Sequence, residues 1–272
     1  MSTALKGGLA ALLFWATSAL ALPYSNLVVF GDSLADSGNN YLATGGAQTS
    51  VPLSGPTVPI YPYASGRYSN GPVWTEYFAN SLGLGLAPSL LGGNNYAFGG
   101  ARVAGASPVP TLQQQVGLYL SANTVSANAL YVIEGGGNDA RDVLDLVMSG
   151  QDPTQRIADY VLGMVDMIGT LAGLGANHFL VWNITDLGLV PAVTAQGTAA
   201  AQGASSVVAT MNLLLTQALA ALPGSVTDDL ILFDAYAGLN DIVANPAAYG
   251  LADASTACAA DGACDASQAF FW

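Results

Sequence analysis

Four short apolar runs, spaced widely along the 272 residues, constrain the fold of this chain more than any other feature. They lie at residues 27–30, 129–133, 179–182 and 230–233. Each run is continuously apolar rather than alternating, which is typical of a parallel strand covered on both faces. Helix-length segments separate the runs, and this alternation predicts an α/β fold with a mostly parallel sheet.

Two of the intervening segments show a helical period. We expect one helix to use Asp152 as its N-cap and Pro153 in its first turn, and to end near Gly173. The second amphipathic stretch covers residues 206–222 and stops at a Pro-Gly pair. No internal repeat or linker interrupts this pattern, so we expect one domain over residues 22–272.

Residues 41–72 break the alternation with a segment rich in Gly, Pro, Ser and Thr. Loops of this length in compact domains are usually functional or disordered. Its tyrosines are compatible both with a wall beside a site and with plain surface packing.

The N-terminus has the pattern of a secretory signal. Lys6 supplies a positive charge, an apolar stretch follows, and Ala-Leu-Ala ends at Ala21. A membrane anchor is the alternative, but the apolar run is short for a span and Pro23 follows at once. We therefore expect residues 1–21 to be removed and the remainder to be secreted, extracellular or periplasmic.

The charge balance narrows the choice of partners. Asp and Glu number 18 against 5 Lys and Arg. Nucleic-acid binding needs a basic patch for phosphate contacts, so we expect no nucleic-acid partner. No later run of 18 residues is free of charges and turn formers, so we also expect no integral membrane segment after signal cleavage.

The two cysteines, Cys258 and Cys264, flank an Asp-Gly turn signal. Export permits a disulfide between them. A metal site is the poorer interpretation, because two cysteines without a nearby histidine or third cysteine do not complete a tetrahedral ligand set. We expect no metal and no cofactor.

Three glycine-rich segments follow extended runs. Ser33 comes just after the first apolar run, in Gly-Asp-Ser, and Asn138 comes soon after the second, in a run of glycines. Gly99 and Gly100 end another extended stretch. Ligands in open α/β sheets bind beyond the carboxyl ends of the strands. A hydroxyl, a backbone N–H and an amide would there form a nucleophile with an oxyanion hole, although each segment is also ordinary turn or cap chemistry.

These segments resemble the blocks of the GDSL esterase/lipase family, also called SGNH hydrolases. Residues 31–34 (GDSL) resemble its first block, residues 95–101 (NYAFGGA) its second and residues 136–139 (GGND) its third. The likeness runs from about Leu27 to Trp272. It implies a flavodoxin-like three-layer α/β/α sandwich and hydrolysis of carboxylic esters, with a small-molecule ester or lipid as substrate.

The resemblance also implies site residues. Ser33 corresponds to the nucleophile, and the oxyanion donors correspond to the Ser33 N–H, the Gly100 N–H and the Asn138 side chain. Gly100 is preferred to Gly99 because the fixed glycine of the second block falls at that place. The rival α/β-hydrolase fold would need a G-x-S-x-G pentapeptide, which the sequence lacks.

The base that takes the serine proton is missing from this pattern. The family supplies it in a closing Asp-x-x-His block after a short aromatic run, whereas this sequence stops on such a run at Trp272. We therefore expect the printed chain to be a truncated secreted esterase, inactive or nearly so, since a serine hydroxyl is a poor nucleophile without a base. A non-catalytic acyl- or glycan-binding pseudoenzyme and an exported surface domain are the alternatives.

His178 is the one histidine in the sequence and a poor substitute. It opens the third apolar run at its amino end, about 15 Å from the carboxyl edge at roughly 3.3 Å per residue. Asp139 and Asp186 lie nearer that edge. A carboxylate without an imidazole is a weak base for serine, and we expect both to accept hydrogen bonds from loop N–H groups.

Overall fold

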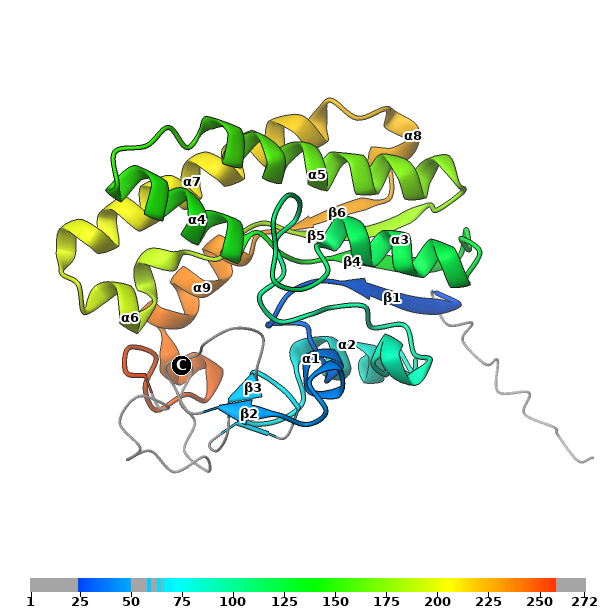
Figure 1. Ribbon diagram of the computed structural model, residues 1–272, viewed down its shortest axis with the longest axis horizontal. Helices are drawn as coiled ribbons and strands as arrows, with labels where there is room; N and C mark the ends of the chain where they lie inside the picture. Colours follow the sequence, from blue (N-terminus) through cyan, green and yellow to red (C-terminus); the bar gives the residue numbers. More distant parts are fainter. Residues whose placement is uncertain (1–23, 50–57, 60–62, 65, 258–272) are drawn as a thin grey trace, which may run out of the picture.

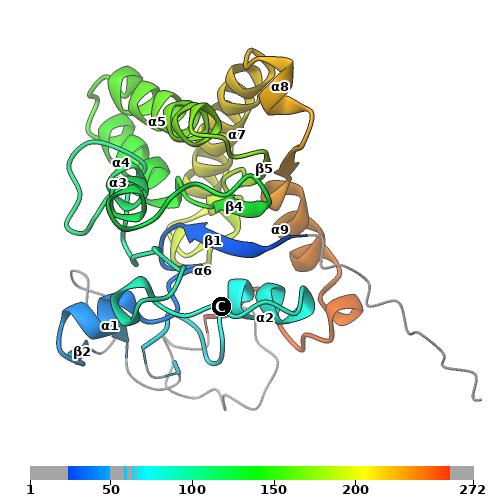
Figure 2. The same cartoon turned by 90° about the vertical axis from the view of Figure 1, so that its right-hand side faces the viewer.

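A computed structural model describes residues 24–49, 58–59, 63–64 and 66–257. The expected signal segment 1–21, the Cys258–Cys264 pair and the C-terminal aromatic run lie outside these residues. In the part that is described, a parallel sheet lies between two layers of helices (Figures 1 and 2).

The central sheet confirms all four predicted strands. Its order is β1 (Asn26–Phe30), β4 (Ala129–Ile133), β5 (His178–Trp182) and β6 (Leu230–Phe233), and every pair is parallel. Because all four strands run the same way, their carboxyl ends form one edge of the sheet, where the first and third sequence blocks begin.

A further extended segment runs beside β1 on its other side. Val29 donates to the carbonyl of Asn94 at 2.9 Å and accepts from the N–H of Tyr96 at 2.7 Å. Gly31 accepts from Phe98 at 3.1 Å. Counting this segment as an edge strand, the order becomes 2-1-3-4-5, which is the flavodoxin-like order. The predicted three-layer α/β fold is confirmed.

Helices and short strands fill the rest of the described chain. The α-helices are α1 (Asn39–Ala43), α2 (Trp74–Ser81), α3 (Leu112–Ala122), α4 (Gly137–Met148), α5 (Thr154–Gly173), α6 (Pro191–Thr194), α7 (Thr198–Ala220), α8 (Gly224–Thr227) and α9 (Ala235–Ala244). The 3-10 helices are η1 (Ser89–Leu91), η2 (Leu187–Leu189) and η3 (Pro246–Tyr249), and a small separate sheet pairs β2 (Gln48–Thr49) with β3 (Val58–Pro59).

The two faces of the sheet carry alternate side chains of each strand. Both faces are buried at β1 and β4, whereas Ile231 and Phe233 of β6 are exposed. One face packs under α3, α5 and α7, and its large buried side chains include Phe30, Tyr131 and Phe179. The opposite face packs against α2, with Val29 and Val132 fully buried. Burial on both faces explains the continuous apolar runs of β1 and β4.

Two helix boundaries differ from the sequence predictions. The helix expected at Asp152 begins at Thr154, and Pro153 takes the cap position while the Asp152 carboxylate accepts from the Thr154 N–H at 2.9 Å. The second helix begins at Thr198, well before the apolar stripe, because its alanine-rich start favours a helix without contributing a stripe. The long loop is also partly structured, since it includes β2 and β3.

Helix α7 is long and apolar enough to cross a membrane by length and composition. Its inner side chains, among them Val208, Met211 and Leu215, are nevertheless fully buried in the cluster between the helices and the sheet. Contact with α5 along this buried side makes α7 part of the domain core.

Candidate active site

The chain makes one tight turn as it leaves β1. The N–H groups of Ala35 and Asp36 both bond to the Asp32 carbonyl, at 3.2 and 3.0 Å. The Asp32 carboxylate accepts from Leu34 at 3.1 Å. Ser33 is half-buried, and neither its N–H nor its hydroxyl bonds to any residue that the structure describes. Both groups are therefore available to a ligand at the carboxyl edge.

Gly31 anchors this turn in the core. Its N–H donates to Gln115 Oε1 at 2.9 Å, and its carbonyl accepts from Gln115 Nε2 at 2.9 Å. A Cβ on Gly31 would lie 2.9 Å from both Ala35 Cβ and Glu134 Oε2, so only glycine fits. Gln115 was not among the residues predicted from the sequence. The one sign of it there is a polar residue on the otherwise apolar face of α3.

The two glycines of the second block have different surroundings. Gly99 donates its N–H to the buried Asp36 carboxylate at 3.0 Å. The N–H of Gly100 has no acceptor within the described ranges. Gly100 has φ +85°, and a Cβ there would meet nothing within 4 Å, so its space is open. The choice of Gly100 over Gly99 as the donor is therefore compatible with the geometry.

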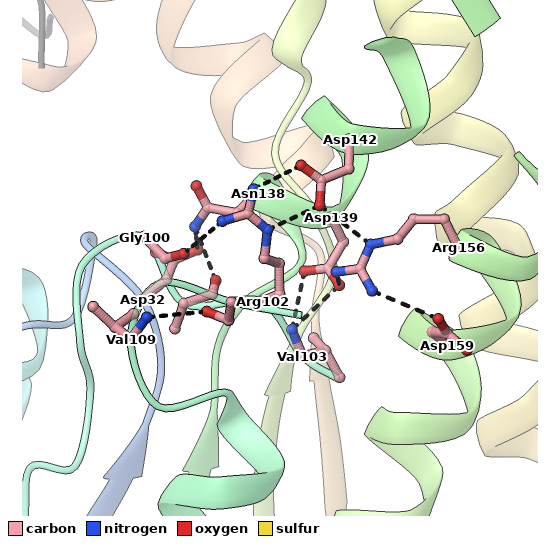
Figure 3. A network of polar contacts seen from close by, with 12 residues as sticks. Asp32, Gly100, Arg102, Val103, Val109, Asn138, Asp139, Asp142, Arg156 and Asp159 are labelled. Atoms are coloured by element: carbon pink, nitrogen blue, oxygen red, sulfur yellow. Dashed lines mark hydrogen bonds and ion pairs between the residues drawn. The ribbon is translucent and has the colours of Figure 1, made fainter. Parts of the chain in front are cut away.

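Asn138 joins the three blocks at the start of α4. Its Nδ2 donates to the Ala101 carbonyl at 2.9 Å and to Asp32 Oδ2 at 3.3 Å. Figure 3 shows Asp32, Gly100 and Asn138 gathered at one point. Both amide hydrogens thus have acceptors here, and an oxyanion would have to replace the longer bond to Asp32.

Two buried carboxyls lie beneath this point. The pKa of Asp32 is raised to about 7, mainly by burial. The charges of Asp139 and Asp36 contribute to this rise, and the Leu34 N–H opposes it. Burial and the charge of Asp32 together hold the pKa of Glu134 well above its usual range. Glu134 Oε2 lies 3.4 Å from the Asp32 nitrogen. Glu134 was not predicted from the sequence, where it is simply a polar residue at the end of a strand.

Asp139 and Asp186 both accept hydrogen bonds from backbone N–H groups, as expected from the sequence. Asp139 accepts from the Val103 N–H on both oxygens, at 3.2 and 3.1 Å. Asp186 accepts from the Gly188 N–H at 2.9 Å. Burial raises the pKa of Asp139 to about 6, although Arg156 acts in the opposite direction.

His178 lies at the amino edge of the sheet, as predicted. It pairs with Leu130 in the register of β4 and β5, packs edge-on against Tyr24 at 5.4 Å, and has Nδ1 3.8 Å from Asp229 Oδ2. A cavity of about 560 Å³ also lies at this edge, lined in part by Asn94, and is remote from Ser33. No cluster of three potential metal ligands occurs in the described part of the chain.

Comparison with known proteins found one matching family and several relatives of this chain. The family described as GDSL-like lipase/acylhydrolase matches residues 27–267. A GDSL esterase/lipase of Arabidopsis thaliana is 30% identical over 283 residues, which cover 87% of this chain and 73% of that protein. The phosphatidylcholine-sterol acyltransferase of Aeromonas hydrophila is 29% identical over 245 residues, covering 86% of this chain and 65% of that protein.

Esterase EstA of Pseudomonas aeruginosa is 32% identical over 274 residues. The alignment covers 90% of this chain and 40% of that esterase. The chain therefore spans about three quarters of the plant protein but less than two thirds of the two bacterial ones.

Proposed function

We propose that Ser33 is the nucleophile of this chain, which belongs to the GDSL-like lipase/acylhydrolase family and is, at family level, a hydrolase of ester bonds. In this proposal Ser33 forms the acyl-enzyme. The oxyanion of the tetrahedral intermediate then accepts from the N–H groups of Ser33 and Gly100 and from the Asn138 amide. The substrate is a small-molecule ester or a lipid.

The observation that carries this proposal is the pair of unused N–H donors at the carboxyl edge. Ser33 and Gly100 both leave their N–H groups without an acceptor in the described residues. Asn138 bonds to the residues next to both of them, Asp32 and Ala101, so it ties the two donors to one place. Backbone N–H donors fixed in this way stabilise a developing oxyanion because they need no reorganisation during the reaction.

The proton of Ser33 has no imidazole acceptor in the printed sequence. The single histidine, His178, lies at the opposite edge of the sheet. We propose that these 272 residues by themselves hydrolyse esters slowly, and that the oxyanion donors supply most of the remaining rate acceleration. In the serine protease subtilisin, loss of the whole triad costs about 10⁶ in kcat and leaves roughly 10³–10⁴ over water.

The first experiment tests the nucleophile. A fluorophosphonate probe should modify Ser33 in a version of the chain that carries a relative's Asp-x-x-His segment at its end, and peptide mapping should find the adduct in the peptide that contains Gly31. Ser33→Ala should abolish it. Ser37→Ala is a matched control, because the Ser37 hydroxyl is buried and without a partner in the described structure. An adduct that persists in Ser33→Ala would refute the assignment.

The second experiment tests the missing base. Hydrolysis of p-nitrophenyl butyrate is compared between the printed chain and a version carrying a relative's Asp-x-x-His segment at its end. Activity that rises several orders of magnitude and vanishes in Ser33→Ala supports the proposal. Fast turnover by the printed chain would show that the base lies elsewhere. Ligand binding that persists in Ser33→Ala, without turnover in either version, would favour an acyl- or glycan-binding protein.

The N-terminal pattern supports export as part of the same proposal. If residues 1–21 are a signal segment, the exported protein begins at Leu22, acts outside the cytoplasm and retains no integral membrane segment. Mass spectrometry of the exported chain tests this, and a start at Met1 would refute it.

A further inference from the structure

Four consecutive residues after Gly100 are each bonded to α4 or α5. The bonds join Ala101 to Asn138, Arg102 to Asp142, Val103 to Asp139 and Ala104 to Arg156. Figure 3 shows the charged part of this network beside Gly100 and Asn138. The segment that carries one proposed donor is thus attached to the helix that carries another.

Arg102 attaches the segment at Gly100 itself. Its Nε and Nη2 bond the two oxygens of Asp142 at 2.8 and 2.7 Å. Its remaining nitrogen, Nη1, donates to the Gly100 carbonyl at 3.3 Å. One planar guanidinium therefore fixes the Gly100 backbone relative to a side chain of α4, which a lysine ammonium would not do.

Arg156 attaches the other end of the segment from α5. Its Nη2 lies 2.5 Å from Asp139 Oδ1, and its Nη1 donates to the Ala104 carbonyl at 2.9 Å. The Asp139 side chain is fully buried and that of Arg156 is 12% exposed. Asp139 follows Asn138 directly in the sequence. Separating the two side chains would leave a buried charge without compensation, so the pair resists movement of Asp139 away from Arg156.

We propose that Arg102, Asp139, Asp142 and Arg156, together called the arginine clamp, are positioning residues that set the spacing between the Gly100 N–H and the Asn138 amide. This inference rests on the proposed function. Gly100 has a left-handed backbone on a segment without regular structure, and glycine has the widest conformational freedom of any residue. Oxyanion donors must lie about 2.7–3.1 Å from the oxyanion, so a small displacement of this segment matters.

The test compares Arg102→Met with Arg67→Met in the version of the chain that carries a relative's Asp-x-x-His segment. The Arg67–Glu76 pair is a close match, with two bonds of 2.7 and 2.6 Å and side-chain exposures of 28% and 16%, against 24% and 28% for Arg102 and Asp142. We expect Arg102→Met to slow fluorophosphonate modification of Ser33 about tenfold, since losing one donor outright costs about 10²–10³. The half-saturating probe concentration should barely change, and Arg67→Met should stay within about twofold of wild type.

A double-mutant cycle separates positioning from general destabilisation. If the clamp acts through the donors, Arg102→Met should have a smaller effect in an Asn138→Ala background, where one donor is already gone. An equal effect in both backgrounds would overturn the proposal.

Amide NMR tests the clamp without any chemistry at Ser33. The Gly100 N–H and Asn138 side-chain resonances should shift in Arg102→Met and in Arg156→Lys, which keeps the charge but loses the planar fork, and not in Arg67→Met. If wild-type Ser33 does not react at all, the proposed function fails while this measurement still decides the clamp. Unchanged resonances in both clamp variants would refute the clamp alone.

Discussion

The side-chain amide of Gln115 bonds both backbone groups of Gly31, at 2.9 Å each. A residue of α3 thereby continues the hydrogen bonding of β1 at the point where the strand ends. Gln115 is fully buried, and its Nε2 also donates to the Pro110 carbonyl at 3.1 Å. The position of Ser33, two residues after Gly31, therefore depends on a helix more than eighty residues away in the sequence.

Replacing Gln115 with leucine should destabilise the domain and slow the reaction of Ser33. The Gly31 carbonyl would keep its bond from Phe98, but the Gly31 N–H would lose its acceptor, which costs about 1–3 kcal/mol when buried. Urea denaturation measures the loss, and fluorophosphonate modification reports the turn. Gln113→Leu, on the same helix but with only an exposed bond to Asp166, should change neither by much. Equal behaviour of the two variants would contradict this role.

Glu134→Gln should stabilise the protein at alkaline pH and not at acid pH. The folded state raises the pKa of Glu134, so it binds that proton more tightly than the unfolded chain does. The stability associated with Glu134 is therefore fully present below its ordinary pKa of 4.5 and is lost as the pH rises. Glutamine does not ionise, so the Glu134→Gln variant should not lose this stability as the pH rises.

Calorimetry at pH 4 and pH 8 measures this effect. At pH 8 the Tm of Glu134→Gln should exceed that of wild type by roughly 2–4 °C or more, the shift that about 1 kcal/mol produces in a domain of this size. Glu76→Gln, which breaks an ion pair with Arg67, should instead lower the Tm at pH 8. If the Tm of Glu134→Gln, compared with that of wild type, is lower at pH 8 than at pH 4, then the folded state favours the carboxylate form of Glu134 instead.

The four strands were predictable from their continuous apolar runs, which in β1 and β4 reflect burial on both faces. The start of α7 was not predictable, because its first turns consist of small residues such as Ala199 and form no stripe of large apolar side chains. Ser33, Gly100 and Asn138 were chosen as candidates from their sequence blocks and the family resemblance, and their roles stay predictions. Gln115 of α3 and Glu134, the residue after β4, both bond to the same turn, and only the folded chain brings them together. No local pattern marks such contacts, since they join residues about a hundred positions apart.

His178→Ala should leave the reaction of Ser33 unchanged. The side chain lies at the amino edge beside Tyr24, while Ser33 follows the carboxyl end of β1. Its nearest acid, Asp229, is 3.8 Å away and largely exposed, so the contact contributes little to stability. The measurement is the rate of fluorophosphonate modification near neutral pH. A loss of tenfold or more, in a variant with wild-type Tm, would mean that His178 takes part after all.

Gly100→Ala and Gly99→Ala should fail for different reasons. At Gly100 a methyl group meets nothing within 4 Å, but φ +85° costs an L-residue about 1–2 kcal/mol. At Gly99 a Cβ would lie 2.2 Å from the Tyr68 ring, so packing must change. We therefore expect Gly100→Ala to lose about 1–2 kcal/mol and to slow Ser33 modification, because relaxing φ turns the N–H away. Gly99→Ala should lose more stability.

Gly117→Ala is the matched control for these two variants. Gly117 lies within α3, with open space at its Cβ and no left-handed backbone, so alanine should stabilise the protein by about 0.5–1 kcal/mol without affecting Ser33. Urea denaturation and fluorophosphonate modification of the three variants give both quantities. Wild-type reactivity in a destabilised Gly100→Ala would remove Gly100 from the oxyanion hole, because a donor whose backbone has turned should not stabilise the intermediate equally well.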